Sequence, residues 1–156
     1  MRRPRPAHGA QAGSATVDRV TSTPVKRSRL RTAGRLALGG ALVVAGTGHL
    51  TFVRRAFQGQ VPRSITDATP FSADDVVLMS GIVEIGLGAA LVVLPKEQRR
   101  IGRIAAAFFT AIYPGNVSQW ARGDSSLGLD TDRKRAVRLV FQPLLVLGAL
   151  WSTGSI

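Results

Sequence analysis

The chain has 156 residues, 45% of them hydrophobic, and its 21 Lys and Arg against nine Asp and Glu give a net charge of +12. It contains no cysteine, which excludes disulfides, thiolate metal sites and cysteine-based redox chemistry. The charge would suit a nucleic-acid-binding protein, but we expect no nucleic-acid partner, because basic and apolar residues are segregated along the chain as in membrane proteins.

Residues 1–32 hold eight of the 21 basic residues and no apolar run. Such a segment cannot bury enough surface to fold by itself, so we predict a disordered basic tail. Lys26, Arg27, Arg29 and Arg31 lie directly before the first apolar run and favour the cytoplasmic side of a membrane for this end of the chain. Specific binding of an anionic lipid is the alternative interpretation of these four residues.

Four apolar stretches follow, and we predict a membrane domain over residues 33–153. A helix rises about 1.5 Å per residue, so stretches of this length can cross a hydrocarbon core of about 30 Å. The sequence therefore predicts an all-α fold, a transmembrane four-helix bundle, with helices at about residues 33–53, 74–94, 101–120 and 136–152.

The first predicted helix contains Gly46, where a neighbouring helix can approach closely, and His49 lies near its end. In the connection that follows, Phe57, Val61 and Ile65 recur at a spacing of four residues. That spacing indicates a short amphipathic segment on the membrane surface.

The second predicted helix is the most apolar, and Ser72 to Asp75 before it has the S-x-x-D pattern of a helix N-cap. Glu84 is the one ionisable side chain between Val76 and Leu94. An acid at the bilayer centre costs about 3 kcal/mol, which the eleven Val, Leu and Ile residues of this stretch offset. An ionisable residue at this depth is a functional-site hypothesis, and Gly81 and Gly88 share its face of the helix.

The third predicted helix contains Pro114, which frees a backbone carbonyl and should kink the helix. The fourth contains Gln142 near its start. Trp120 and Trp151 fall where the predicted helices meet the membrane surface, as amphipathic aromatic side chains prefer. The distribution of Lys and Arg over the connections predicts a multi-pass protein of the cell membrane with both termini cytoplasmic.

Antiparallel helices would place His49, Tyr113, Asn116 and Gln142 in the outer half of the membrane and Glu84 near its midplane. These five residues could converge into a polar pocket that handles protons or binds a quinone headgroup. The alternative is that they form hydrogen bonds between helices and only hold the bundle together. We find no metal-ligand spacing, nucleophile triad or phosphate-binding glycine loop.

From Arg35 to Trp120, the order of these features resembles the DoxX-like family of small four-helix membrane proteins. The resemblance is carried by four groups of residues: Gly46, Gly48, His49 and Phe52; Phe57 with Val61-Pro62; Ser80, Gly81, Glu84, Gly86 and Gly88; and Tyr113-Pro114-Gly115-Asn116. The chain departs from the pattern at Gly115, where many relatives have Ala, and in its long basic tail.

The resemblance implies an accessory subunit of a quinone-linked membrane redox assembly. A bound quinone and redox partners in the membrane follow from the resemblance alone, and we expect the chain not to be a catalyst by itself. Two alternatives stay open: a membrane assembly factor or chaperone, and a small proton-coupled transporter element that uses Glu84.

Overall fold

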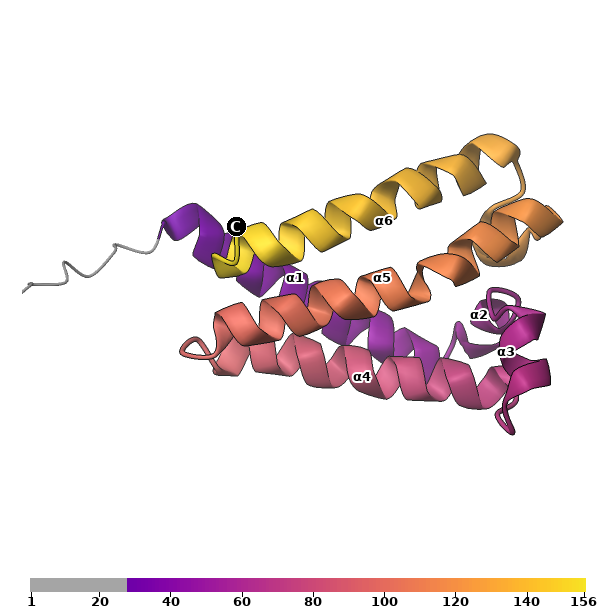
Figure 1. Cartoon of the computed structure of the whole chain (residues 1–156), viewed down its shortest axis with the longest axis horizontal. Helices are drawn as coiled ribbons and strands as arrows, with labels where there is room; N and C mark the ends of the chain where they lie inside the picture. Colours follow the sequence, from indigo (N-terminus) through magenta and orange to yellow (C-terminus); the bar gives the residue numbers. More distant parts are fainter. Residues whose placement is uncertain (1–27) are drawn as a thin grey trace, which may run out of the picture.

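The structure is a computed structural model that describes residues 28–156, and within this range the chain is helical and contains no strand. The predicted all-α class is therefore confirmed for these residues. The long helices lie side by side and the short ones lie near one end of them (Figure 1). In chain order the helices are α1 (Arg29–Leu50), α2 (Arg54–Gln58), α3 (Arg63–Ala68), α4 (Ala73–Val93), α5 (Gln98–Arg122), the 3₁₀ turn η1 (Ser126–Gly128) and α6 (Asp132–Thr153).

The long helices extend further at their basic ends than the apolar pattern predicts. α1 begins at Arg29, so residues 29–32 are helical, and assigning them to a disordered tail was wrong. Residues 1–27 of that predicted tail lie outside the described range. Because Arg has a high helix propensity, a run of arginines before an apolar stretch does not stop a helix. For the same reason α5 begins at Gln98 and not at residue 101.

α6 begins at Asp132, four residues before the predicted start, because Thr131 caps it. The Thr131 hydroxyl accepts a hydrogen bond from the backbone N–H of Lys134. α5 and α6 both end in a left-handed glycine, Gly123 at φ 65° and Gly154 at φ 73°.

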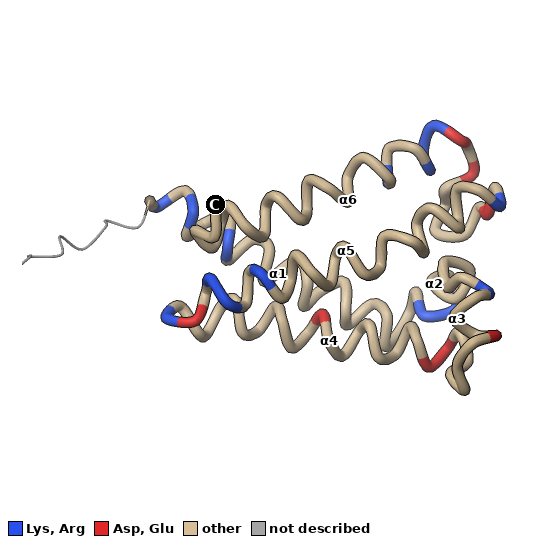
Figure 2. Tube along the Cα trace, in the orientation of Figure 1, with Lys and Arg blue, Asp and Glu red and all other residues tan. Residues whose placement is uncertain are grey.

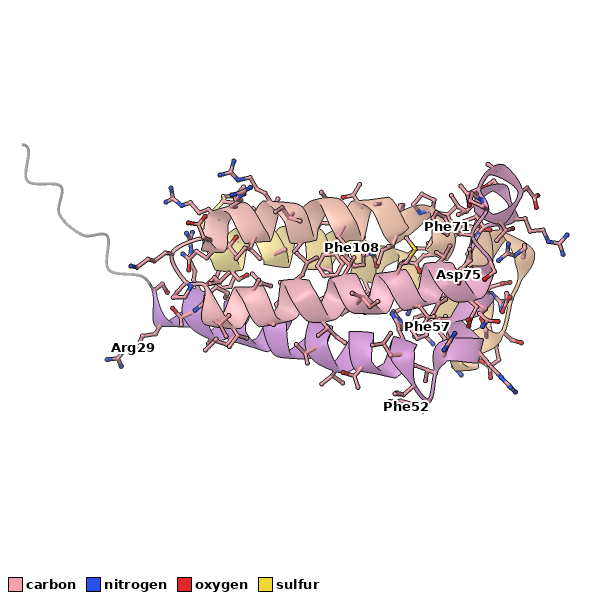
Figure 3. All side chains as sticks on the ribbon, turned by 90° about the horizontal axis from the view of Figure 1, so that it is seen from below. Arg29, Phe52, Phe57, Phe71, Asp75 and Phe108 are labelled. Atoms are coloured by element: carbon pink, nitrogen blue, oxygen red, sulfur yellow. The ribbon has the colours of Figure 1, made fainter. Side chains whose placement is uncertain are left out.

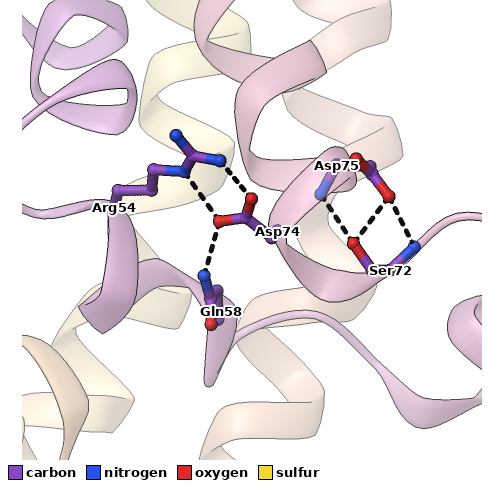
Figure 4. Close-up of polar contacts among 5 residues, drawn as sticks. All are labelled: Arg54, Gln58, Ser72, Asp74 and Asp75. Atoms are coloured by element: carbon purple, nitrogen blue, oxygen red, sulfur yellow. Dashed lines mark hydrogen bonds and ion pairs between the residues drawn. The ribbon is translucent and has the colours of Figure 1, made fainter.

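The connection between α1 and α4 forms two short helices, α2 and α3, in place of one amphipathic segment. Pro62 lies directly before the first residue of α3. It has no N–H to donate, so it cannot continue a helix from the residues before it. Asp74, in the first turn of α4, accepts hydrogen bonds from Arg54 and Gln58 of α2 and so ties the connection to α4 (Figure 4).

The start of α4 has the cap that its sequence pattern predicts. The Ser72 hydroxyl accepts from the Asp75 backbone N–H at 3.1 Å, and the Asp75 carboxylate accepts from the Ser72 backbone N–H at 2.9 Å (Figure 4). This reciprocal pair is a capping box.

α1 packs mainly against α4, and α5 packs mainly against α6, while contacts between the two pairs are fewer. Two glycine pairs bring the backbones of α1 and α4 together. A Cβ on Gly46 would lie 2.5 Å from the Gly81 carbonyl oxygen, and one on Gly88 would lie 2.5 Å from the Gly39 carbonyl oxygen. Gly39 and Gly46 are seven residues apart on α1, and Gly81 and Gly88 are seven residues apart on α4, so both contacts fall on one face of each helix.

Arg35 is buried in α1 and donates a hydrogen bond to the carbonyl of Leu91 in the last turn of α4. The residue four positions after Leu91 is Pro95, whose nitrogen carries no hydrogen. The carbonyl of Leu91 therefore cannot be satisfied by the helix itself. The Arg35 guanidinium supplies the missing donor and fixes the start of α1 to the end of α4.

Among the described helices, α4 and α6 are long and apolar enough to cross a membrane. α1 and α5 fall short of this, although all four stretches were expected to qualify. Arg35 and His49 lower the hydropathy of α1, while Asn116 and Gln119 lower that of α5. These four side chains are buried in the structure, so the residues that make the helices less apolar face the other helices.

We predict that Gly46→Ala lowers the melting temperature of the protein, because the added methyl group would push α1 away from the Gly81 carbonyl. Overpacking of this kind costs about 1–3 kcal/mol. Gly40→Ala is the matched control, since a Cβ at Gly40 of the same helix meets nothing within 4 Å. It should raise stability slightly through helix propensity. Equal effects of the two substitutions on thermal unfolding, followed by circular dichroism, would contradict the close contact.

Candidate functional site

A cavity of about 540 Å³ lies between the two helix pairs, close to the end that carries α2 and α3. Four of the five polar residues predicted to converge line it: His49, Glu84, Asn116 and Gln142. Tyr113 does not belong to this lining, although the next two residues, Pro114 and Gly115, do. The rest of the wall is mostly apolar.

His49 of α1 and Glu84 of α4 meet at this cavity. The Nδ1 atom of His49 is 3.2 Å from Oε2 of Glu84, and both side chains are buried. The Ser80 hydroxyl, one turn before Glu84, donates to Oε1 at 3.3 Å. The Phe57 ring packs edge-on against the imidazole, with 3.8 Å between centroids. Figure 3 shows Phe57 further inside the molecule than Phe52, which lies at its surface.

The contact between the His49 imidazole and the Glu84 carboxylate does not satisfy all of their hydrogen-bonding atoms. Within residues 28–156, neither ring nitrogen of His49 nor Oε2 of Glu84 has a hydrogen bond of good geometry. Buried polar atoms are nearly always hydrogen-bonded, and leaving one unpaired costs about 1–3 kcal/mol. The pair therefore keeps hydrogen-bonding capacity at the wall of the cavity.

Arg138 of α6 is a site residue that the sequence analysis missed. Its Nε donates to Oδ1 of Asn116 at 3.0 Å, and its Nη2 donates to Oε1 of Gln60 at 3.1 Å. Its guanidinium carbon lies 5.9 Å from the centroid of the Phe57 ring. Arg138 precedes Gln142 by four residues on one helix, and that spacing, which places both on one face, was the signal available in the sequence.

Asn116 and Gln142 connect α5 to α6 at the wall of the cavity. The Asn116 amide donates to Oε1 of Gln142 at 3.1 Å, and the Gln142 amide donates to the Phe109 carbonyl at 2.8 Å. Pro114 interrupts the backbone ladder of α5 just beyond Phe109, and the helix changes direction in its second half (Figure 1). The Gln142 amide thus adds a hydrogen bond to the backbone of α5 one residue before Thr110, whose carbonyl loses its helical donor at Pro114.

The end of α5 and the link between α5 and α6 contact residues 59 and 60, which follow α2. Arg122 donates to the Gly59 carbonyl, and Gln60 donates to the buried Gln119 side chain. Hydrogen bonds from the Ser126 side chain and backbone N–H hold the pKa of the Asp124 carboxyl below its usual range. The Asp124 carboxylate therefore stays ionised, and keeps its hydrogen bonds to Ser126, to a lower pH than a free aspartate would.

The site combines an apolar wall with a few converging polar groups, which is the usual composition of a small-molecule pocket. His49 and Arg138 supply donors, Glu84 supplies an acceptor, and the amides of Asn116 and Gln142 can do both. The described residues contain no group of three or more His, Cys, Asp or Glu side chains placed to hold a metal ion.

Fold and site together define an all-helical protein of four long helices around a mostly apolar cavity with a charged, hydrogen-bonding wall. The family model for a domain of unknown function (DUF8561) matches residues 38–153, so the chain belongs to this family. The match covers α1 from its third turn onward and all later helices. No curated protein and no solved structure matches the chain.

We predict that Gln142→Leu destabilises the protein by about 1–3 kcal/mol, because it leaves the buried Asn116 amide N–H without its acceptor and removes the hydrogen bond to the Phe109 carbonyl. Gln98→Leu is the control, because Gln98 makes no side-chain hydrogen bond within the described residues. It should change stability by less than about 0.5 kcal/mol. Thermal unfolding of both variants measures the difference, and a neutral Gln142→Leu would mean that these contacts contribute little.

Proposed function

We propose that the chain is a multi-pass membrane protein in which α1, α4, α5 and α6 form a transmembrane four-helix bundle. Buried residues make up only 33% and 22% of the most apolar windows of α4 and α6, which is unlike the core helices of a soluble protein. Large apolar side chains such as Val44, Ile82, Val140 and Leu147 are exposed along the middle of the helices. Lys, Arg, Asp and Glu gather near the two ends (Figure 2).

The charges at the two ends favour cytoplasmic termini. Within the described residues, the end with the start of α1 carries seven basic residues and one acid: Arg29, Arg31, Arg35, Lys96, Arg99, Arg100 and Arg103, with Glu97. The opposite end carries eight basic residues and six acids: Arg54, Arg55, Arg63, Arg122, Arg133, Lys134, Arg135 and Arg138, with Asp67, Asp74, Asp75, Asp124, Asp130 and Asp132. The six Lys and Arg of residues 1–27 precede α1 in the sequence and bring the count at this end to 13 against eight, so under the positive-inside rule the first end lies in the cytoplasm.

Within the membrane, the protein binds a lipophilic molecule with a polar, oxygen-bearing head. The observation that carries this proposal is the contact between His49 and Glu84, whose free hydrogen-bonding capacity faces a mostly apolar cavity. A structural role would be served by a fully hydrogen-bonded pair. A buried ionisable pair at this depth is costly and usually functional.

The resemblance to the DoxX-like family narrows the ligand to a quinone and the role to an accessory subunit of a membrane redox assembly. His49 and Arg138 are the donors available to carbonyl oxygens, and the apolar wall suits a ring and its substituents. Glu84 lies beside His49 and can orient the imidazole toward a ligand in the cavity.

The test is purification of the full chain in mild detergent, followed by solvent extraction and mass analysis of bound small molecules. We predict that wild type carries a quinone-class lipid, that Glu84→Gln carries at least about tenfold less, and that Ala45→Phe, which fills the cavity, carries almost none. Ala37→Phe is the matched control, because Ala37 is exposed on α1 and does not line the cavity. It should keep the wild-type amount.

Wild type without any lipophilic small molecule would overturn the binding proposal. If such a sample carried partner proteins, and Glu84→Gln carried the same ones, the protein would be an assembly factor or chaperone and the polar cluster would serve packing.

A second candidate function is proton transfer. The same contact favours it, because a proton can move between the His49 imidazole and the neighbouring buried carboxylate of Glu84. We predict for this function a proton flux across vesicles that contain the reconstituted protein, read with a pH-sensitive dye. Glu84→Gln should abolish the flux and Ala37→Phe should leave it unchanged. A flux equal in wild type and Glu84→Gln would exclude this role.

A further inference from the structure

Another cavity, of about 740 Å³, lies at the opposite end of the molecule from α2 and α3. It is formed by the start of α1, the link between α4 and α5, the first turns of α5 and the end of α6. Most of its charged lining is basic: Arg31, Lys96, Arg99, Arg100 and Arg103, with Glu97 as the single acid.

These five cations have no carboxylate partner among residues 28–156. At the other end of the molecule the described cations are often paired, as in Arg54 with Asp74 and Lys134 with Asp130. The hollow at the start of α1 therefore concentrates positive charge that the described part of the chain does not neutralise.

The surroundings of the hollow are apolar. Arg31 lies over the Trp151 ring, with 6.0 Å from its guanidinium carbon to the centroid. Leu30 and Val93, each 67% exposed, lie close in sequence to the lining residues Arg31 and Lys96. A ligand that satisfies both features has an anionic group for the arginines and apolar chains for the neighbouring helix surfaces.

We propose that this basic hollow binds the phosphate headgroup of an anionic membrane lipid. The inference rests on the membrane location proposed above, which places the hollow at the cytoplasmic surface, where anionic headgroups lie. Basic pockets between membrane helices on this side are typical of headgroup binding. If these residues served only to orient the protein, basic side chains near the helix ends would be enough. They would not need to surround a hollow large enough to hold a headgroup.

The test is native mass spectrometry of the full-length protein in detergent, with phosphatidylglycerol or phosphatidylcholine added as probe. Wild type should bind phosphatidylglycerol at least about tenfold more tightly than phosphatidylcholine. The triple variant Arg99→Gln/Arg100→Gln/Arg103→Gln should lose this preference. The control Arg55→Gln/Arg63→Gln/Arg133→Gln removes the same charge at the opposite end and should keep it.

Three results would overturn the proposal: equal affinity of wild type for the two lipids, equal loss in the two triple variants, or full retention of the preference in the variant of the hollow. Circular dichroism checks that both variants are folded. A further arm adds inorganic phosphate: if it raises the melting temperature as much as phosphatidylglycerol does, the ligand is a soluble anion and not a lipid.

The outcome is separable from that of the proposed function. The hollow shares no residue with the cavity at His49 and Glu84, so failure to find a quinone leaves the lipid test intact. If a carbonate wash released the protein from membranes, both the quinone proposal and the lipid proposal would lose their basis.

Discussion

The close approach of α1 and α4 is the constraint on which the rest of the structure depends. His49 and Glu84 each lie one helical turn beyond the glycine of their own helix in the pair Gly46 and Gly81. A Cβ on Gly81 would meet Cβ of His49 at 2.9 Å, and one on Gly46 would meet Cβ of Glu84 at 3.0 Å. Only glycine lets the two backbones approach to the distance at which imidazole and carboxylate meet.

The two helix pairs are held together by different means. α1 and α4 rely on glycine contacts and on the Arg35 hydrogen bond to the Leu91 carbonyl. α5 and α6 rely on side-chain amides, because Gln142 of α6 bonds both to the Asn116 side chain and to the Phe109 carbonyl of α5. The cavity lies where these two pairs meet, and Arg138 reaches from α6 to the connection that follows α1.

Much of this arrangement follows from local sequence. Glycines at helical spacing, the S-x-x-D cap and an isolated acid in an apolar run each have a direct physical meaning, so the helices, the start of α4 and the inward-facing position of Glu84 could be predicted. Helix ends were less predictable, because arginine both extends a helix and signals the membrane surface. Tyr113 and Arg138 show the limit: which face of α5 or α6 turns inward depends on the kink and on packing between helices distant in sequence.

The hydrogen bond between Arg35 and the Leu91 carbonyl also bears on how the protein is made. The two residues are 56 positions apart. At 5 to 20 residues per second, α4 leaves the ribosome roughly 3 to 11 seconds after α1. Until then the side chains of Arg35 and His49 have no helix to pair with. In the proposed membrane topology, α1 would have to wait at the translocon or near the surface, and its insertion would be completed only when α4 arrives.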